Sequence, residues 1–101
     1  MQKNHVLYSV TTYSSQYNIP LSFVQELYDR GLIDLQKEAE EYYIFEDQLP
    51  QLEHFTRLHC DFDINVAGIE VVEDLLSRIN ELREQTRLLK SKVSLLRELN
   101  G

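Results

Sequence analysis

Two histidines and a cysteine in the middle of the chain are the residues whose chemistry fits a metal ion. His54, His59 and Cys60 lie close together in the sequence, and imidazole and thiolate groups are common zinc ligands. In a helix, however, residues five apart do not share a face. Cys60 is the only cysteine, which excludes an internal disulfide and a zinc site built from several cysteines. We therefore expect no metal and no cofactor, and we interpret Cys60 as a small buried side chain.

Neighbouring carboxylates are the second group with catalytic potential. The pairs are Glu40-Glu41, Glu46-Asp47 and Glu73-Asp74. Adjacent side chains point apart, so neither member of a pair is placed to assist the other in acid–base catalysis. The sequence also has no glycine-rich phosphate loop and no nucleophile motif. These observations predict that the protein is not an enzyme.

Charge is distributed unevenly along the chain. Residues 1–75 hold fourteen acidic side chains against four basic ones, whereas residues 76–101 hold three acidic against six basic. A body with so much negative charge is suited to protein partners and poorly suited to the phosphates of nucleic acids.

The length of 101 residues and the apolar content of 43% allow one modest core. The N-terminus, MQKNHVLYSV, has no apolar run of signal length, and no later run approaches a membrane span. We expect a cytoplasmic protein with no membrane segment.

Residues 11–33 carry the pattern of a helix-turn-helix. A first helix, capped by Thr11 or Thr12, is predicted to end before the turn at 17–20, because the residue before a proline avoids helical conformation. Apolar residues then recur at helical spacing over 21–30, and Gly31 is the expected stop.

A small wing is predicted after the second helix. Residues 33–35 and 42–45 are rich in residues that favour strands, and the charged residues 36–41 are the expected turn between them. A middle helix is predicted to begin near Pro50. Its pattern breaks at 61–64, where we expect Phe62 and Ile64 to enter the core.

The last helix is predicted to begin after Asn65 as its N-cap and to continue to about residue 99. We therefore divide the chain into a winged-helix domain, residues 1–65, and a coiled-coil segment, residues 66–101. Apolar residues occupy the a and d positions of four heptads with one threonine among them: Val72, Leu75, Ile79, Leu82, Thr86, Leu89, Val93 and Leu96. We call these eight residues the seam.

The seam predicts self-association, although its inner half is also suited to covering its own domain. The flanking e and g positions are mostly basic: Arg78, Arg83, Lys90, Lys92 and Arg97, with Gln85 neutral. Like charges across an exposed pair cost only a few tenths of a kcal/mol each, which is less than the burial of eight seam side chains contributes. A homo-oligomer is expected, with parallel or antiparallel pairing left open.

Three blocks of sequence, which together cover most of the chain, are similar to those of a known family. They are residues 19–33 with Tyr28-Asp29-Arg30-Gly31-Leu32-Ile33 at their centre, Tyr43-Ile44-Phe45 followed by Glu46, Asp47, Leu49 and Leu52, and the entry into the last helix at 63–76. They resemble the MerR-type winged-helix proteins, in particular the CbpM-type chaperone modulators. The resemblance implies a mainly α fold: a MerR-like helix-turn-helix domain, a two-stranded wing and a long coiled-coil helix.

The resemblance leaves two functions to weigh. MerR-type transcriptional regulators present arginines and tyrosines from the second helix to DNA, and counting back from Gly31 the corresponding positions here hold Ser22, Gln25 and Glu26. In the expected wing, Lys37 stands among glutamates. Specific DNA binding draws on several phosphate contacts, so direct DNA binding by a dimeric regulator is the less favoured alternative.

The modulator resemblance instead implies a protein partner. Proteins of that family bind the J-domain of a DnaJ-like co-chaperone similar to CbpA, and they restrain its stimulation of the Hsp70 ATPase. Because J-domains present a basic helix, we hypothesise an acidic partner-binding surface on the second helix and the wing. Its residues are Glu26, Asp29, Glu38, Glu40 and Glu41 around an exposed Tyr42. The alternatives are that these charges only solvate the surface, or that the partner is a different protein.

Overall fold

The computed structural model describes residues 6–101, so Lys3 and the rest of the first five residues lie outside the description. The chain forms two compact units, residues 1–69 and residues 70–101. We call them the N-terminal unit and the C-terminal unit and describe each by itself. The fold is mainly helical with a small antiparallel sheet, as predicted for a MerR-like winged-helix protein.

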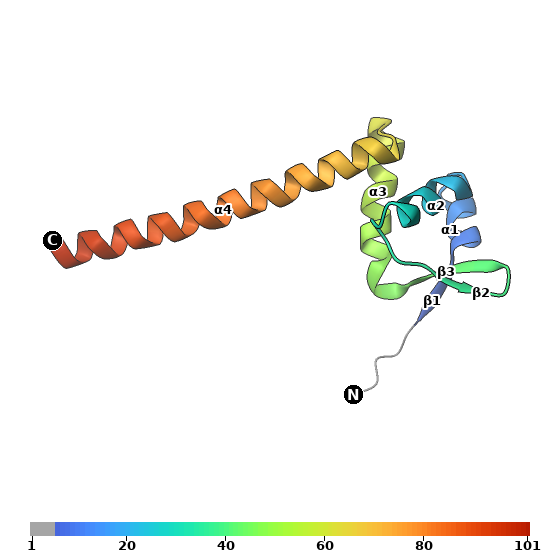
Figure 1. The fold of residues 1–101 in the computed structure, drawn as a ribbon, viewed down its shortest axis with the longest axis horizontal. Helices are drawn as coiled ribbons and strands as arrows, with labels where there is room; N and C mark the ends of the chain where they lie inside the picture. Colours follow the sequence, from blue (N-terminus) through green and yellow to red (C-terminus); the bar gives the residue numbers. More distant parts are fainter. Residues whose placement is uncertain (1–5) are drawn as a thin grey trace. The chain divides into compact units, whose positions relative to one another are not determined.

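The sheet has three strands, one more than the predicted wing. Strands β2 (Gln36–Glu38) and β3 (Glu41–Phe45) form the wing hairpin, and β1 (Leu7–Ser9) adds to the other edge of β3 in the order β1-β3-β2 (Figure 1). The prediction of a strand at 33–35 was wrong. The backbone N–H of Asp34 donates to Oε1 of Gln48 at 2.8 Å, and Ile33 is buried in the core. The chain therefore reaches the sheet only at Gln36.

Helices α1 (Val10–Gln16) and α2 (Leu21–Asp29) form the predicted helix-turn-helix. The cap of α1 is Ser9, whose Oγ accepts the Thr12 N–H at 3.2 Å, and not Thr11 or Thr12. At the end of α2, Gly31 has φ +76°, which favours glycine. The N–H of Leu32 then reaches the Leu27 carbonyl at 2.9 Å and closes the helix.

A turn of 3-10 helix, Glu46–Gln48, leads into α3 (Leu49–Phe62), which continues further than predicted. Asp63 ends α3 with a left-handed φ of 55°. Phe62 lies before this turn and is 68% exposed, so its predicted place in the core was wrong, whereas Ile64 packs against the core. The prediction that Cys60 is buried was also wrong, because it lies on the exposed face of α3.

The core of the N-terminal unit joins α1, α2, α3 and β3 with the first turn of the last helix. Figure 1 shows α1, α2 and α3 gathered beside the small sheet. The largest completely buried side chains come from five elements: Phe55, Leu27, Ile44, Leu52, Ile69, Val10 and Val24. Burying aliphatic and aromatic side chains of this kind contributes about 1.5–3 kcal/mol each, so these contacts hold the wing and α2 in fixed positions.

Helix α4 (Val66–Asn100) is continuous over 35 residues. Asn65 caps it as predicted, with its Oδ1 accepting the Gly68 N–H at 2.8 Å. Val66 and Ile69 from its first turn are buried in the core of the N-terminal unit. The division into a winged-helix domain, residues 1–65, and a coiled-coil segment, residues 66–101, remains a prediction.

Candidate protein-binding site

The predicted acidic surface begins on α2. Glu26 and Asp29 are both exposed, because the buried face of this helix is formed by Phe23, Val24 and Leu27. Glu26 lies 3.5 Å from Nε of Arg30 one turn later. An ion pair between two such exposed side chains contributes little to stability, so Glu26 can exchange this partner at small cost.

The tip of the wing supplies the other carboxylates. Glu38 and Glu41 face each other across the hairpin, and Glu40 is exposed in the turn between them. The hydroxyl of Tyr43 donates to Oε2 of Glu41 at 3.0 Å, and this hydrogen bond raises the pKa of Tyr43. Three carboxylates at one hairpin tip produce a strongly negative local potential.

Two tyrosines connect the wing to α2. The rings of Tyr28 and Tyr42 lie 6.2 Å apart between centroids, and Nζ of Lys37 lies 5.7 Å from the centroid of Tyr42. Tyr42 is half-buried against the core and not exposed as predicted, whereas Tyr28 is 39% exposed. Tyr28 is not among the site residues predicted from the sequence, although its position one helical turn from Val24 places it beside the buried face.

Basic residues are few in this region. Between residues 21 and 45 the only cations are Arg30 and Lys37, which lie beside Glu26 and Tyr42 respectively. Ser22 and Glu26 are exposed at two of the positions where the regulators carry basic or aromatic residues, and Gln25 is half-buried. This face of α2 has the neutral residues Ser22 and Gln25 at the two arginine positions of a DNA-binding helix, and the carboxylate Glu26 at a tyrosine position.

His54 and His59 have structural contacts. Nδ1 of His59 lies 2.9 Å from the carbonyl oxygen of Ile64, and its ring stacks on Phe23 with centroids 4.4 Å apart. The ring of His54 contacts Phe55. Among residues 6–101, no three histidine, cysteine or acidic side chains are grouped as a metal site.

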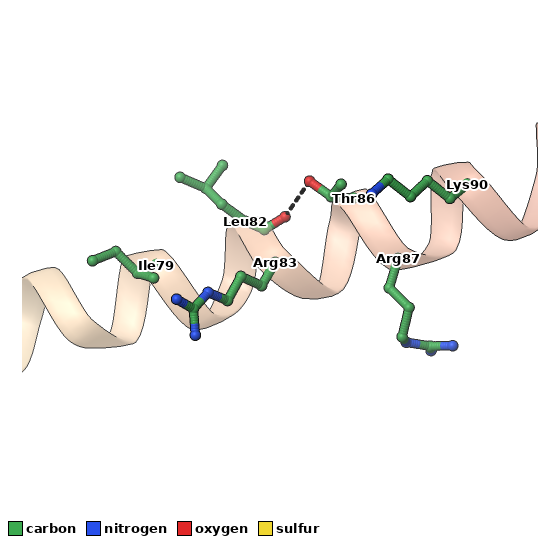
Figure 2. A pocket seen from close by; sticks show the side chains of 6 residues that line it. All are labelled: Ile79, Leu82, Arg83, Thr86, Arg87 and Lys90. Atoms are coloured by element: carbon green, nitrogen blue, oxygen red, sulfur yellow. Dashed lines mark hydrogen bonds between the residues drawn. The ribbon is translucent and has the colours of Figure 1, made fainter.

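The seam lies along α4 and is mostly exposed. Val72 is half-buried, whereas Leu75 and Leu89 are 51% and 62% exposed. Figure 2 shows Ile79 and Leu82 projecting from α4, with the hydroxyl of Thr86 donating to the Leu82 carbonyl at 2.9 Å. That bond satisfies the one polar group of the seam within its own helix, so Thr86 can enter an apolar interface without losing a partner.

Basic side chains border the same part of α4. Arg83, Arg87 and Lys90 line a shallow hollow together with three seam residues, Ile79, Leu82 and Thr86 (Figure 2). Arg87 is paired with Glu84 at 2.6 Å, and this pair lowers the pKa of Glu84.

None of the helices described is long and apolar enough to cross a membrane.

The helix-turn-helix, the wing and the long final helix define a winged-helix protein of the MerR type. The sequence profile of the "MerR HTH family regulatory protein" group matches residues 8–91. The chain therefore belongs to this family.

Within the family the chain is similar to chaperone modulators of the CbpM type. It is 24% identical over 83 residues to the "Chaperone modulatory protein CbpM" of Pseudomonas putida strain W619, covering 81% of this chain and 82% of that one. It is 22% identical over the same length, with the same coverage, to the protein of that name from Pseudomonas entomophila strain L48. The resemblance predicted from the sequence blocks is confirmed.

Proposed function

We propose that this protein is a non-catalytic modulator that binds the J-domain of a DnaJ- or CbpA-like co-chaperone and inhibits it. The observation that carries the proposal is the acidic surface formed by Glu26 and Asp29 on α2 and by Glu38, Glu40 and Glu41 on the wing. The names of the CbpM relatives support a chaperone-modulating role.

Physical complementarity supports the same partner. Carboxylates opposite the basic helix of a J-domain would speed encounter and fix its orientation. Tyr28, exposed between the two groups of acids and in contact with Tyr42, provides an aromatic anchor of the kind that dominates many interfaces. A J-domain whose basic helix is covered in this way could not present that helix to Hsp70.

Reversing the charges on α2 tests this surface. We expect the double substitution Glu26→Lys and Asp29→Lys to weaken binding to an isolated J-domain by about tenfold or more at low salt, because attraction becomes repulsion. The loss should shrink as salt screens the charges. Fluorescence anisotropy with a labelled J-domain at two salt concentrations measures both effects.

The matched control is Glu46→Lys with Asp47→Lys, which changes the net charge equally. Both residues are exposed and lie outside the proposed surface. We expect the control to retain most of the affinity. Equal affinity of the α2 variant and the unsubstituted protein would reject this surface.

The second candidate function is a dimeric MerR-type transcriptional regulator, which the family name favours. The seam would supply the dimer. DNA binding by such a regulator requires phosphate contacts, which α2 and the wing meet poorly. Between residues 21 and 45 they carry five carboxylates and two cations, not counting Asp34 in the connecting loop.

A further inference from the structure

A hollow of about 290 Å³ lies in the N-terminal unit between β1, α1 and the start of α3. Its walls include three tyrosines, two leucines and one acid: Tyr8, Tyr13, Tyr17, Leu7, Leu49 and Glu53. β1 and the wing strand β2 are at opposite edges of the sheet. The hollow is therefore distinct from the acidic surface on α2 and the wing tip.

The inner wall of the hollow is fixed in place. Tyr13 is 5% exposed, and its ring stacks on Tyr17 with centroids 4.3 Å apart and planes at 23°. The Thr56 hydroxyl donates to the Leu52 carbonyl at 2.8 Å. Since that bond uses its single proton, Thr56 accepts from the Tyr13 hydroxyl, also at 2.8 Å. The wall is thus organised before any ligand arrives, which lowers the cost of binding.

The outer residues of the hollow remain open to solvent. Tyr8 and Tyr17 are 42% and 45% exposed. Leu7 and Leu49 are half-buried beside them. A ligand would therefore meet aromatic rings and aliphatic side chains, together with the polar residues Ser9, Thr12 and Gln16 that also line the hollow.

The charge of the hollow has one sign. Glu53 is exposed at its edge, and no basic side chain lines the hollow among the residues described. Aromatic rings attract cations through the negative face of the ring. Long cationic side chains bury their methylene groups on apolar surface while their charged ends reach a polar group. A lysine or arginine side chain provides both the cation and the methylene groups.

We propose that this hollow binds a lysine or arginine side chain carried by a basic helix of the protein partner. The cation lies against the tyrosine rings and pairs with Glu53, and its methylenes lie against Leu7 and Leu49. This inference rests on the proposed function for the identity of the partner. It adds a second contact area to the acidic surface on α2 and the wing.

Two substitutions remove the two halves of this recognition. Glu53→Gln removes the charge and keeps the shape of the side chain, and Tyr17→Leu keeps an apolar cover on Tyr13 but removes the aromatic face. We expect each to weaken J-domain binding by about three- to fivefold. The control is Asp61→Asn, an exposed acid on the same helix and outside the hollow. We expect its affinity to stay within about twofold.

A second measurement does not depend on the J-domain. Butylguanidinium is titrated into the full chain, and the ring protons of Tyr8 and Tyr17 are followed by NMR. We expect saturable shifts of these two rings that are strongly reduced in the Glu53→Gln variant. Circular dichroism of every variant confirms that the fold is intact.

The outcomes separate the two claims. If the J-domain binds and neither hollow variant weakens it, the hollow inference is overturned and the proposed function stands. If the J-domain does not bind, the proposed function fails, and the butylguanidinium shifts alone decide whether the hollow takes a cation. If Glu53→Gln alters self-association and leaves J-domain affinity unchanged, the cation comes from a second copy and our choice of partner is wrong.

Discussion

At the scale of single residues, the pair of Tyr13 and Thr56 shows how a polar contact is placed inside the core. Tyr13 is almost completely buried and donates to Thr56 at 2.8 Å. Burial raises its pKa to about 12. The phenol therefore stays neutral over the physiological range and holds the aromatic wall to α3.

The raised pKa of Tyr13 makes the stability of the protein depend on pH. A tyrosine whose pKa is about 10 when unfolded and about 12 when folded stabilises the protein fully below pH 10. This contribution is lost as the pH rises towards 12, because the unfolded chain releases the proton first. We expect Tyr13→Phe to lower the free energy of unfolding by about 1 kcal/mol at pH 7, because the substitution removes the hydrogen bond. It should also lose less stability than the unsubstituted protein between pH 8 and 11.

Urea unfolding at pH 7, 8 and 11 measures both effects. Because the other tyrosines remain in the variant, the difference between the two proteins isolates Tyr13. An identical alkaline loss of stability in both proteins would contradict this account.

At the scale of elements, α4 presents a seam that the single chain leaves exposed. Leu82 and Leu89 are 61% and 62% exposed, whereas Leu88, at heptad position c, is 45% exposed and lies outside the seam. A partner helix that covers the a and d positions would bury the first two residues and leave Leu88 at the margin.

We therefore expect Leu82→Ala with Leu89→Ala to dissociate the oligomer, since each truncation removes about 2 kcal/mol or more from a packed interface. The substitution Leu88→Ala is the matched control and should leave the oligomer intact. Sedimentation velocity gives the masses. Equal oligomer mass for all three proteins would show that the seam is not the interface.

Elements with a strong local signal could be predicted from the sequence, and elements fixed by distant contacts could not. Gly31 indicates the end of α2, because glycine adopts a positive φ. Asn65 indicates the start of α4, because its side chain accepts a backbone N–H of the helix. The strand β1 is only three residues long and forms because Leu7 pairs with Phe45 far along the chain. Ile33 has strand propensity but is buried in the core, which moves the first wing strand to Gln36.

The candidate site follows the same rule. The acids of the predicted surface could be identified from the sequence, because their charges contrast with the pattern of the DNA-binding relatives. The contact of Tyr28 with Tyr42 and the meeting of Tyr8, Tyr13 and Tyr17 depend on tertiary packing, and no spacing in the sequence indicates them.

At the scale of the whole molecule, we propose that a winged scaffold with an acidic α2 and wing recognises polypeptide. Residues 1–75 carry ten more acidic than basic side chains. A surface of this sign repels phosphates at any separation that salt does not screen. We expect the same surface to attract the basic helix of a J-domain.

The most direct test compares two ligands of the purified full chain at one physiological ionic strength. Isothermal titration is carried out with an isolated J-domain and, separately, with duplex DNA. We predict saturable binding of the J-domain and no binding of the duplex. Tight, sequence-selective binding of a DNA fragment without binding of the J-domain would contradict the account.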